Sequence, residues 1–401
     1  LMQHTIVLLI LNNISRFYGI PIHIQFSTHP IHSAIILHFP KAMIKYRMKN
    51  NNYALIMAGG QGTRFWPYST LEEPKQFINI VGEGSLILQT FKRLEQVVDR
   101  DKIYVVAHGR YRNRVKEAIP NFVESNFIEE PFAKNTAPCL ILSNIILSEN
   151  EADGNLLVVP ADHYIQDSDI FARQMRDAFQ LAEEKTIVTF GITPDSPHTG
   201  YGYINFNREK PVQIDQTTFF EAAGFKEKPN RNTAQEYLDK GTYLWNSGMF
   251  VYKLRHFRDF LEQYSPYYYE QYQKLEESQN DRNRFIENFS AMEPESIDYA
   301  LMEKVREVRI SPVAFDWNDV GSWSSVYELN PLDQKGNACI GEHALIDTSH
   351  SMAFSTEKKP IAIIGLSDVI VVNTEHGILV SHKDHLQDVK KVHQQLKDRS
   401  K

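Results

Sequence analysis

The chain of 401 residues has few cysteines, no excess of basic residues and no long apolar run. Its two cysteines, Cys139 and Cys339, fit no metal-binding spacing, and such a low number argues against a disulfide framework. A net charge of −7 gives no reason to expect nucleic acid or an anionic membrane as a partner. The apolar run TIVLLIL at 5–11 is too short to span a bilayer. These absences predict a cytoplasmic protein that binds neither nucleic acid nor membrane.

Acidic residues are missing from the first part of the chain. None of the 50 Asp and Glu residues occurs before Glu72, whereas histidines are crowded there. We interpret residues 1–47 as a non-native, disordered upstream extension and expect natural translation to start at Met48.

From Tyr53 onward, short apolar runs alternate with segments of helical periodicity. Strands are expected at 53–58, 103–107, 155–162 and 186–192, and helices at 85–98, 137–149 and 169–184. The strand runs are continuously apolar, so both faces of the sheet are expected to be covered by helices, as in a Rossmann-like α/β fold with a mostly parallel sheet. Ligands of such sheets bind beyond the carboxyl ends of the strands.

The second half of the chain changes character twice. Residues 200–253 suggest hairpin-like strands, and residues 254–306 are mostly helical in pattern. After Gly336, short β runs follow one another closely and end in a charged helix from about Lys383. The predicted domains are therefore residues 48–335 and a small β-rich unit at 336–401, with too little chain after residue 336 for a second enzyme domain.

The stretch AGGQGTRFWPYSTLEEPKQF at 58–77 concentrates glycines and cations directly after a predicted strand. Its glycines are Gly59, Gly60 and Gly62. Backbone without side chains can turn several N–H groups toward one anion. Arg64 can bind phosphate oxygens with its forked guanidinium, and Lys75 adds a second cation. The alternative is a tight turn with solvated charges.

Two familiar phosphate-binding patterns do not fit this stretch. No Lys-Ser/Thr pair follows the glycines, which excludes a P-loop. Phe65 stands where a dinucleotide fingerprint needs its third glycine, which argues against an NAD-dependent dehydrogenase.

Seven stretches of the chain, in order, resemble the motifs of the sugar-1-phosphate nucleotidyltransferases, and most closely those of the mannose-1-phosphate guanylyltransferases. They are LIMAGGQGTRFWPYSTLEEPKQF (55–77), EEPFAKNTAP (129–138), VVPADHYI (158–165), TGYGYI (199–204), FKEKP (225–229), LWNSGMFVY (244–252) and FDWNDVGSW (315–323).

This resemblance implies a GT-A-like transferase domain followed by a β-helix-like unit that aids formation of a homodimer. It implies the reaction of GTP with α-D-mannose 1-phosphate to give GDP-mannose and diphosphate, with Mg²⁺. Another sugar 1-phosphate, such as a heptose 1-phosphate, or another base is the closest alternative. A catalytically inactive sensing subunit would be expected to lack some of the charged motif residues, and none is missing.

The resemblance also implies roles for individual residues. The catalytic residues implied are Arg64, Lys75 and Asp162. The metal ligands implied are Asp162 and Asp319. The nucleotide-binding residues implied are Ala58, Gly59, Gly60, Gly62, Thr63, Arg64, Asn135 and Thr136. The sugar-phosphate-binding residues implied are Gly202, Tyr203, Glu227, Lys228, Asn246 and Ser247.

Several of these residues have plain structural alternatives. Asp162 alone could cap a loop, Thr136 could cap a helix, and the pair Glu227–Lys228 could form a solvated turn. Lys134 stands where the family often has arginine, which leaves its contribution to phosphate or base binding open.

Overall fold

The computed structural model describes residues 23–26, 35–38, 51–60, 62–151 and 153–399, and the chain divides into two units, Leu1–Asn50 and Asn51–Lys401. In the first unit, β1 (His23–Phe26) pairs antiparallel with β2 (Ile35–His38). The interpretation of residues 1–47 as a disordered, non-native extension stays a prediction. The rest of that segment lies outside the described residues.

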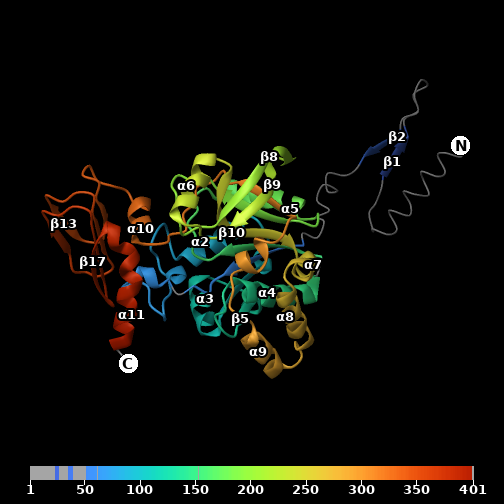
Figure 1. Ribbon diagram of the computed structural model, residues 1–401, viewed down its shortest axis with the longest axis horizontal. Coiled ribbons are helices and arrows are strands. Elements are labelled where there is room, and N and C mark those ends of the chain that lie inside the picture. The colour runs from blue at the N-terminus through green and yellow to red at the C-terminus, as the bar shows by residue number, and fades with distance from the viewer. Residues whose placement is uncertain (1–22, 27–34, 39–50, 61, 152, 400–401) are drawn as a thin grey trace, which may run out of the picture. The chain divides into compact units, whose positions relative to one another are not determined.

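The second unit is built on a nine-stranded sheet (Figure 1). In spatial order its strands are β5 (Phe127–Glu130), β4 (Ile103–His108), β3 (Asn52–Met57), β6 (Asn155–Pro160), β10 (Tyr243–Lys253), β7 (Ile187–Ile192), β11 (Val308–Pro312), β9 (Thr217–Lys226) and β8 (Tyr203–Ile214). β10 and β9 run opposite to the other seven strands. The mostly parallel α/β fold is confirmed, with a reversed strand inserted at its centre.

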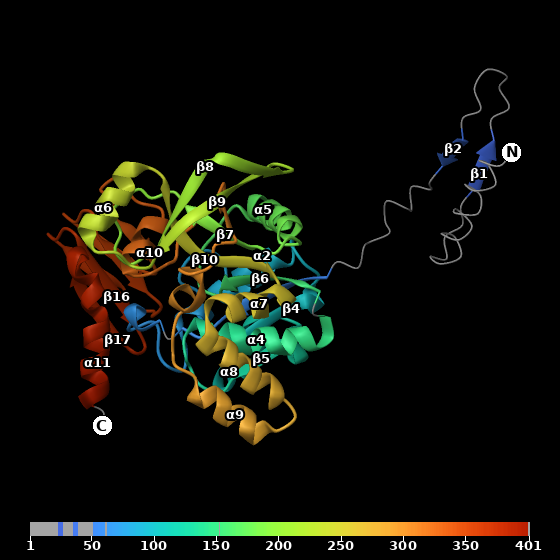
Figure 2. The same cartoon turned by 45° about the vertical axis from the view of Figure 1, so that its right-hand side comes forward.

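Helices cover both faces of this sheet, as the continuous apolar strands predict. In β3, Ala54 and Ile56 join the core on one face and Leu55 joins the core on the other. Figure 2 shows the two helical layers. The first layer contains α2 (Leu86–Leu94), α3 (Arg112–Ala118) and α5 (Ser168–Leu181). The second contains α4 (Thr136–Glu151), α7 (Leu254–Tyr264), α8 (Pro266–Glu277) and α9 (Arg282–Ala291).

The hairpin-like region and the end of the transferase part add two shorter helices, α6 (Arg231–Lys240) and α10 (Trp323–Leu329). None of the helices in the described part of the chain combines the length and the apolar character needed to cross a membrane.

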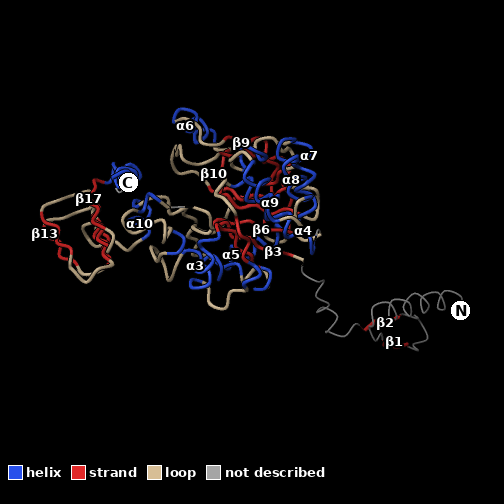
Figure 3. Tube along the Cα trace, turned by 90° about the horizontal axis from the view of Figure 1, so that it is seen from below, coloured by secondary structure: helices blue, strands red, loops and turns tan. Residues whose placement is uncertain are grey.

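The C-terminal part is a stack of short strands followed by a helix (Figure 3). The strands are β12 (Ala338–Ile340), β13 (His343–Ile346), β14 (Met352–Ser355), β15 (Ile361–Ile364), β16 (Val369–Thr374) and β17 (Gly377–His382). Parallel pairs join β12 to β14, β14 to β16 and β13 to β15. Parallel neighbours reached through short loops form the successive coils of a β-helix-like unit, although the sequence shows no exact repeat. The unit ends in α11 (Val389–Arg399).

Trp323 joins the transferase part to the C-terminal unit. Its ring is fully buried, with centroids 5.5 Å from the ring of Phe65 and 5.0 Å from that of Phe354. Its Nε1 donates to the backbone oxygen of Trp66 at 3.2 Å. Since Phe65 belongs to the glycine-rich loop and Phe354 to β14, the loop and the β-helix-like unit share one hydrophobic core.

Candidate active site

The glycine-rich loop follows β3 and tightens into a short 3₁₀ turn, η2 (Thr63–Phe65). Gly62 immediately before it has φ +60°, in the left-handed region. A Cβ on Gly62 would lie 2.5 Å from the Cβ of Lys75 and 2.9 Å from the Lys75 backbone nitrogen. Glycine is therefore required here both by backbone conformation and by close contact with Lys75.

Gln76 fixes the first part of the same loop. Its buried Nε2 donates to the backbone oxygens of Ala58 at 2.8 Å and Gly60 at 3.1 Å. Both acceptors are carbonyl groups of the loop, so the side chain of Gln76 holds the loop in its conformation. Ala58 itself is buried under the loop, and its nucleotide-binding role stays a prediction.

Lys75 lies at the centre of the site. It is 5% exposed, and its Nζ donates to Asp162 Oδ2 at 2.9 Å and to the backbone oxygen of Asp319 at 2.7 Å. Burial alone would raise the pKa of Asp162, but the charge and hydrogen bond of Lys75 overcome burial and hold that pKa below its usual value. Asp162 is therefore ionised, and one ammonium group connects both predicted metal ligands.

Asp319 is held by its own neighbours. Tyr201 donates its hydroxyl to Asp319 Oδ1 at 2.9 Å. The next residue, Val320, has φ +45°, a conformation that a β-branched residue rarely adopts. Asn318 Oδ1 accepts from the Val320 backbone nitrogen at 2.7 Å and stabilises this strained turn. A strained backbone conformation persists only where the surrounding structure stabilises it, and such conformations are frequent at functional sites.

His163 follows Asp162 but is held as an uncharged side chain. Burial, only partly offset by Asp162 and Asp319, lowers the pKa of His163 to about 4. Its Nδ1 accepts a hydrogen bond from Trp317 Nε1 at 3.2 Å. This arrangement suits a supporting role for His163 beside Asp162.

These side chains line one cavity of about 350 Å³, here named the phosphate cavity. It is lined by Gly62, Thr63, Arg64, Phe65, Lys75, Asp162, His163, Asp319, Gly321 and Lys390. Six of the predicted site residues are thus brought together, and Lys390 was not foreseen.

In the part of the chain that the structure describes, no three Asp, Glu, His or Cys side chains form a metal cluster. Mg²⁺ in proteins is usually coordinated by one or two carboxylates, with phosphate and water oxygens in the remaining positions. Asp162 and Asp319 therefore fit this ion.

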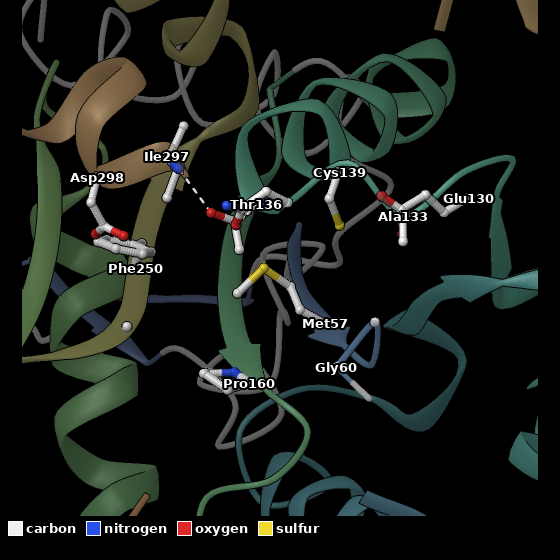
Figure 4. Close-up of a pocket in the computed structure, with 13 residues that line it drawn as sticks. Met57, Gly60, Glu130, Ala133, Thr136, Cys139, Pro160, Phe250, Ile297 and Asp298 are labelled. Atoms are coloured by element: carbon white, nitrogen blue, oxygen red, sulfur yellow. Dashed lines mark hydrogen bonds between the residues drawn. The ribbon is translucent and has the colours of Figure 1, made fainter. Parts of the chain in front are cut away.

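A second cavity of about 350 Å³, here named the base cavity, includes Gly59 and Gly60 of the glycine-rich loop in its lining (Figure 4). It is lined by Met57, Gly59, Gly60, Glu130, Ala133, Asn135, Thr136, Cys139, Pro160, Gly248, Phe250, Ile297 and Asp298. Four predicted nucleotide-binding residues are among them. Thr136 does not cap α4: its Oγ1 accepts from the Ile297 backbone nitrogen at 2.8 Å, while Asn135 Oδ1 accepts from the Thr136 nitrogen at 2.9 Å.

Two carboxyl groups in the base cavity, the buried Glu130 and the half-buried Asp298, were missed by the sequence analysis. Burial raises the pKa of Glu130 to about 7 and that of Asp298 to about 7. Glu130 stands inside a quoted motif, so its position, though not its burial, was visible. Asp298 starts a π-helical turn, Asp298–Met302, and no signal in the sequence pointed to it. Such turns occur often at functional sites.

Four of the six predicted sugar-phosphate residues lie together beside Asp298. Asn246 Nδ2 donates to Asp298 Oδ1 at 3.0 Å, and its backbone nitrogen donates to Gly202. Lys228 forms an ion pair with the buried Glu227. A Cβ on Gly202 would collide with Glu227 Oε2, so glycine lets this carboxylate approach the strand.

The side chains of the other two predicted sugar residues are buried and hydrogen-bonded within the protein, and their role in sugar binding stays a prediction. Tyr203 is 0% exposed, and its hydroxyl donates to the backbone oxygen of His198. Ser247 is buried, and its Oγ accepts from the Met249 backbone nitrogen. Because side chains alternate along a strand, Ser247 and its neighbour Asn246 in β10 point to opposite faces, and Asn246 points toward Asp298.

The open question about Lys134 is also answered by its contacts. Its Nζ donates to the backbone oxygens of Ser290 and Met292. The ammonium therefore stabilises the end of α9 and is not directed at the base cavity.

Residues 53–336 match the family model described as "Nucleotidyl transferase". The chain belongs to the nucleotidyl transferase family. Residues 341–396 match a model described as "MannoseP isomerase/GMP-like beta-helix domain", which confirms the β-helix-like C-terminal unit.

Similar proteins agree with this assignment. A mannose-1-phosphate guanylyltransferase of Escherichia coli (strain K12) is 37% identical over 86% of this chain and 73% of its own length. Xanthan biosynthesis protein XanB of Xanthomonas campestris pv. campestris is 38% identical over the same shares. A crystal structure from Thermus thermophilus, described as mannose-1-phosphate geranyltransferase, has a TM-score of 0.77 at 29% identity and covers 86% of this chain and 99% of its own. The chain is thus a nucleotidyltransferase whose curated relatives include mannose-1-phosphate guanylyltransferases.

Replacing Gly62 by alanine should destabilise this nucleotidyltransferase by about 1–3 kcal/mol, because the new methyl group meets Lys75 in a left-handed conformation. Gly60→Ala is the matched control, since a Cβ there meets nothing within 4 Å. Chemical denaturation of both variants measures the free energy of unfolding. An equal decrease in the free energy of unfolding of the two variants would contradict the conclusion that glycine is required at position 62.

The raised pKa of Glu130 should make stability depend on pH. Between its ordinary value and about 7, the folded state keeps a proton that the unfolded state has lost, so the free energy of unfolding falls as pH rises through this window. Glu130→Gln removes this contribution and should gain stability relative to the parent as pH rises toward 7. Unfolding curves at several pH values test this. The exposed neighbour gives the comparison variant, Glu129→Gln, and equal pH dependence in both would contradict the assignment to Glu130.

Proposed function

We propose that this chain is a mannose-1-phosphate guanylyltransferase that converts GTP and α-D-mannose 1-phosphate to GDP-mannose and diphosphate with Mg²⁺. The observation that carries the proposal is the buried Lys75, which joins Asp162 and Asp319 beside the glycine-rich loop. The names of the relatives support the choice of base and sugar. The assembled site argues against a subunit that has lost its chemistry.

In the proposed reaction an oxygen of the sugar phosphate attacks the α-phosphorus of GTP. The bond from this phosphorus to the oxygen that bridges to the β-phosphate breaks, and that oxygen keeps the electron pair in the departing diphosphate. Lys75 and Arg64 stabilise the phosphate charges, and the backbone of Gly62 and Thr63 lets the triphosphate approach closely. Mg²⁺, when bound to Asp162 and Asp319, supplies further positive charge that offsets repulsion between the two substrates.

The base cavity suits guanine because of Glu130. Glu130, with its pKa raised to about 7, ionises near neutral pH, and the ionised carboxylate accepts hydrogen bonds only. Guanine offers it two neighbouring donors, its N1–H and its 2-amino group. Adenine presents an acceptor at N1 and would leave the buried carboxylate without a partner there, which is costly. Asn135, whose φ of +71° marks a tight turn, and Thr136 border the same cavity.

The sugar is placed at the cluster of Gly202, Glu227, Lys228 and Asn246. Glu227 and Asn246 offer acceptors and donors for hydroxyl groups fixed on a hexose ring. Lys228 adopts a left-handed φ of +43° that a residue with a side chain rarely takes, and its ammonium balances the sugar phosphate.

Measurement of diphosphate release over a grid of nucleoside triphosphates and sugar 1-phosphates tests the proposal. We expect turnover with GTP and mannose 1-phosphate to exceed that with every other pair, including heptose 1-phosphates, and to require Mg²⁺.

Lys75→Ala should lose about 2–4 kcal/mol of transition-state stabilisation. Asp162→Asn, which keeps the shape of the side chain, should lose most of the Mg²⁺-dependent turnover. Normal turnover in either variant, or preference for another pair, would refute the corresponding part.

We further propose a cytoplasmic homodimer that associates through the β-helix-like unit. Ile346 and Ile364 are cross-strand partners on β13 and β15, and they are 55% and 64% exposed. Contiguous patches of exposed large apolar side chains mark protein–protein interaction sites. A second copy of this chain is the occupant, consistent with the expectation drawn from the resemblance.

The double change Ile346→Lys with Ile364→Lys should therefore halve the molar mass measured by light scattering after gel filtration. Charged groups in place of the apolar pair make association unfavourable. Val123→Lys changes an exposed apolar residue of the transferase part and should leave the mass unaltered. A parent protein that is already monomeric would overturn the proposal.

A further inference from the structure

The phosphate cavity contains a cation from the last helix of the chain. Lys390 of α11 lines the cavity together with Thr63, Arg64 and Lys75. Neither the glycine-rich loop nor any other quoted motif includes this residue. The C-terminal unit therefore reaches into the site that the transferase part builds.

We propose that Lys390 binds the departing phosphates of the nucleoside triphosphate, so that the β-helix-like unit takes part directly in substrate binding. The inference rests on the proposed function, because it takes the ligand of the phosphate cavity to be a triphosphate. It assigns to α11 a role beyond assembly.

The position of Lys390 is fixed by the residues around it. Val389, its neighbour, and Leu386 are buried in the same hydrophobic core as Phe65 and Trp323. α11 also packs against η2, the turn that carries Thr63 and Arg64. The helix is thus anchored to the glycine-rich loop itself, and the exposed Lys390 projects from a stable base.

Two lysines near Lys390 in the sequence contact other described residues. The Lys383 ammonium lies 3.5 Å from the ring centroid of Tyr327, and Lys391 pairs with Asp388 at 2.6 Å. Among the side chains that the structure describes, the Lys390 ammonium has no hydrogen-bond or ion-pair partner. An ammonium group at a cavity wall without such a partner is available to an anionic ligand.

The positions of the charged groups in the phosphate cavity indicate that Lys390 binds the β- and γ-phosphates of the nucleoside triphosphate. Lys75 is already bonded to Asp162 and to the backbone of Asp319, the residues that the proposed function sets at the reacting centre. Lys390 comes from the helix packed on η2, next to Arg64. We therefore assign Lys75 to the reacting centre, and Arg64 with Lys390 to the two phosphates that leave as diphosphate.

Calorimetric titration of the full chain in Mg²⁺ with diphosphate, GTP and GDP-mannose tests this assignment. In Lys390→Ala the Kd for diphosphate and for GTP should rise about tenfold, as expected for loss of one charge-assisted hydrogen bond at an open site. The Kd for GDP-mannose should stay unchanged, because this product does not contain the leaving phosphates. Lys390→Arg should retain most of the affinity.

Lys391→Ala is the matched control, since it removes the same charge one residue further along α11. The proposal is overturned if Lys390→Ala leaves the Kd of diphosphate unchanged, if Lys391→Ala weakens it equally, or if GDP-mannose is weakened as much as diphosphate. Coincident unfolding curves establish that the variants fold. Absence of turnover in the parent would refute the proposed reaction, whereas the titration with diphosphate would still decide the role of Lys390.

Discussion

The site depends on one buried ammonium group. Lys75 bonds to the side chain of Asp162, which follows β6, and to the backbone of Asp319 near the end of the transferase part. Its side chain also lies in the space left by the missing side chain of Gly62. A buried charge without partners is costly, so the three segments are stable only together. The same interaction that stabilises the fold here holds the predicted catalytic groups in position.

This arrangement uses the general property of parallel sheets that strand ends converge at one edge. β3 leads into the glycine-rich loop and β6 into the loop of Asp162, and the two strands are direct neighbours. The reversed β10, between β6 and β7, brings Asn246 to Asp298 beside the base cavity. The antiparallel insertion of β10 therefore brings Asn246, one of the residues proposed to bind the sugar, to a cavity beside the parallel strands.

The β-helix-like unit and the transferase part share a core beneath the phosphate cavity. Trp323 contacts Phe65 of the glycine-rich loop and Phe354 of β14. Because protein interiors are close-packed, displacement of the β-helix-like unit would also displace the glycine-rich loop. The location of Lys390 follows from this shared core, since the buried Val389 next to it belongs to the same cluster.

The sequence by itself determined the α/β class, the strands and helices of the first half, and the loops that carry charge, because apolar periodicity and glycine patterns are local. It also indicated Lys75, Asp162 and Asp319 through their motifs. Only the tertiary structure decided which side chains face the cavities: it buried Tyr203, raised the pKa of Glu130 by burial and brought Lys390 from the end of the chain. Burial and long-range proximity arise from packing between segments distant in sequence, and no local pattern contains them.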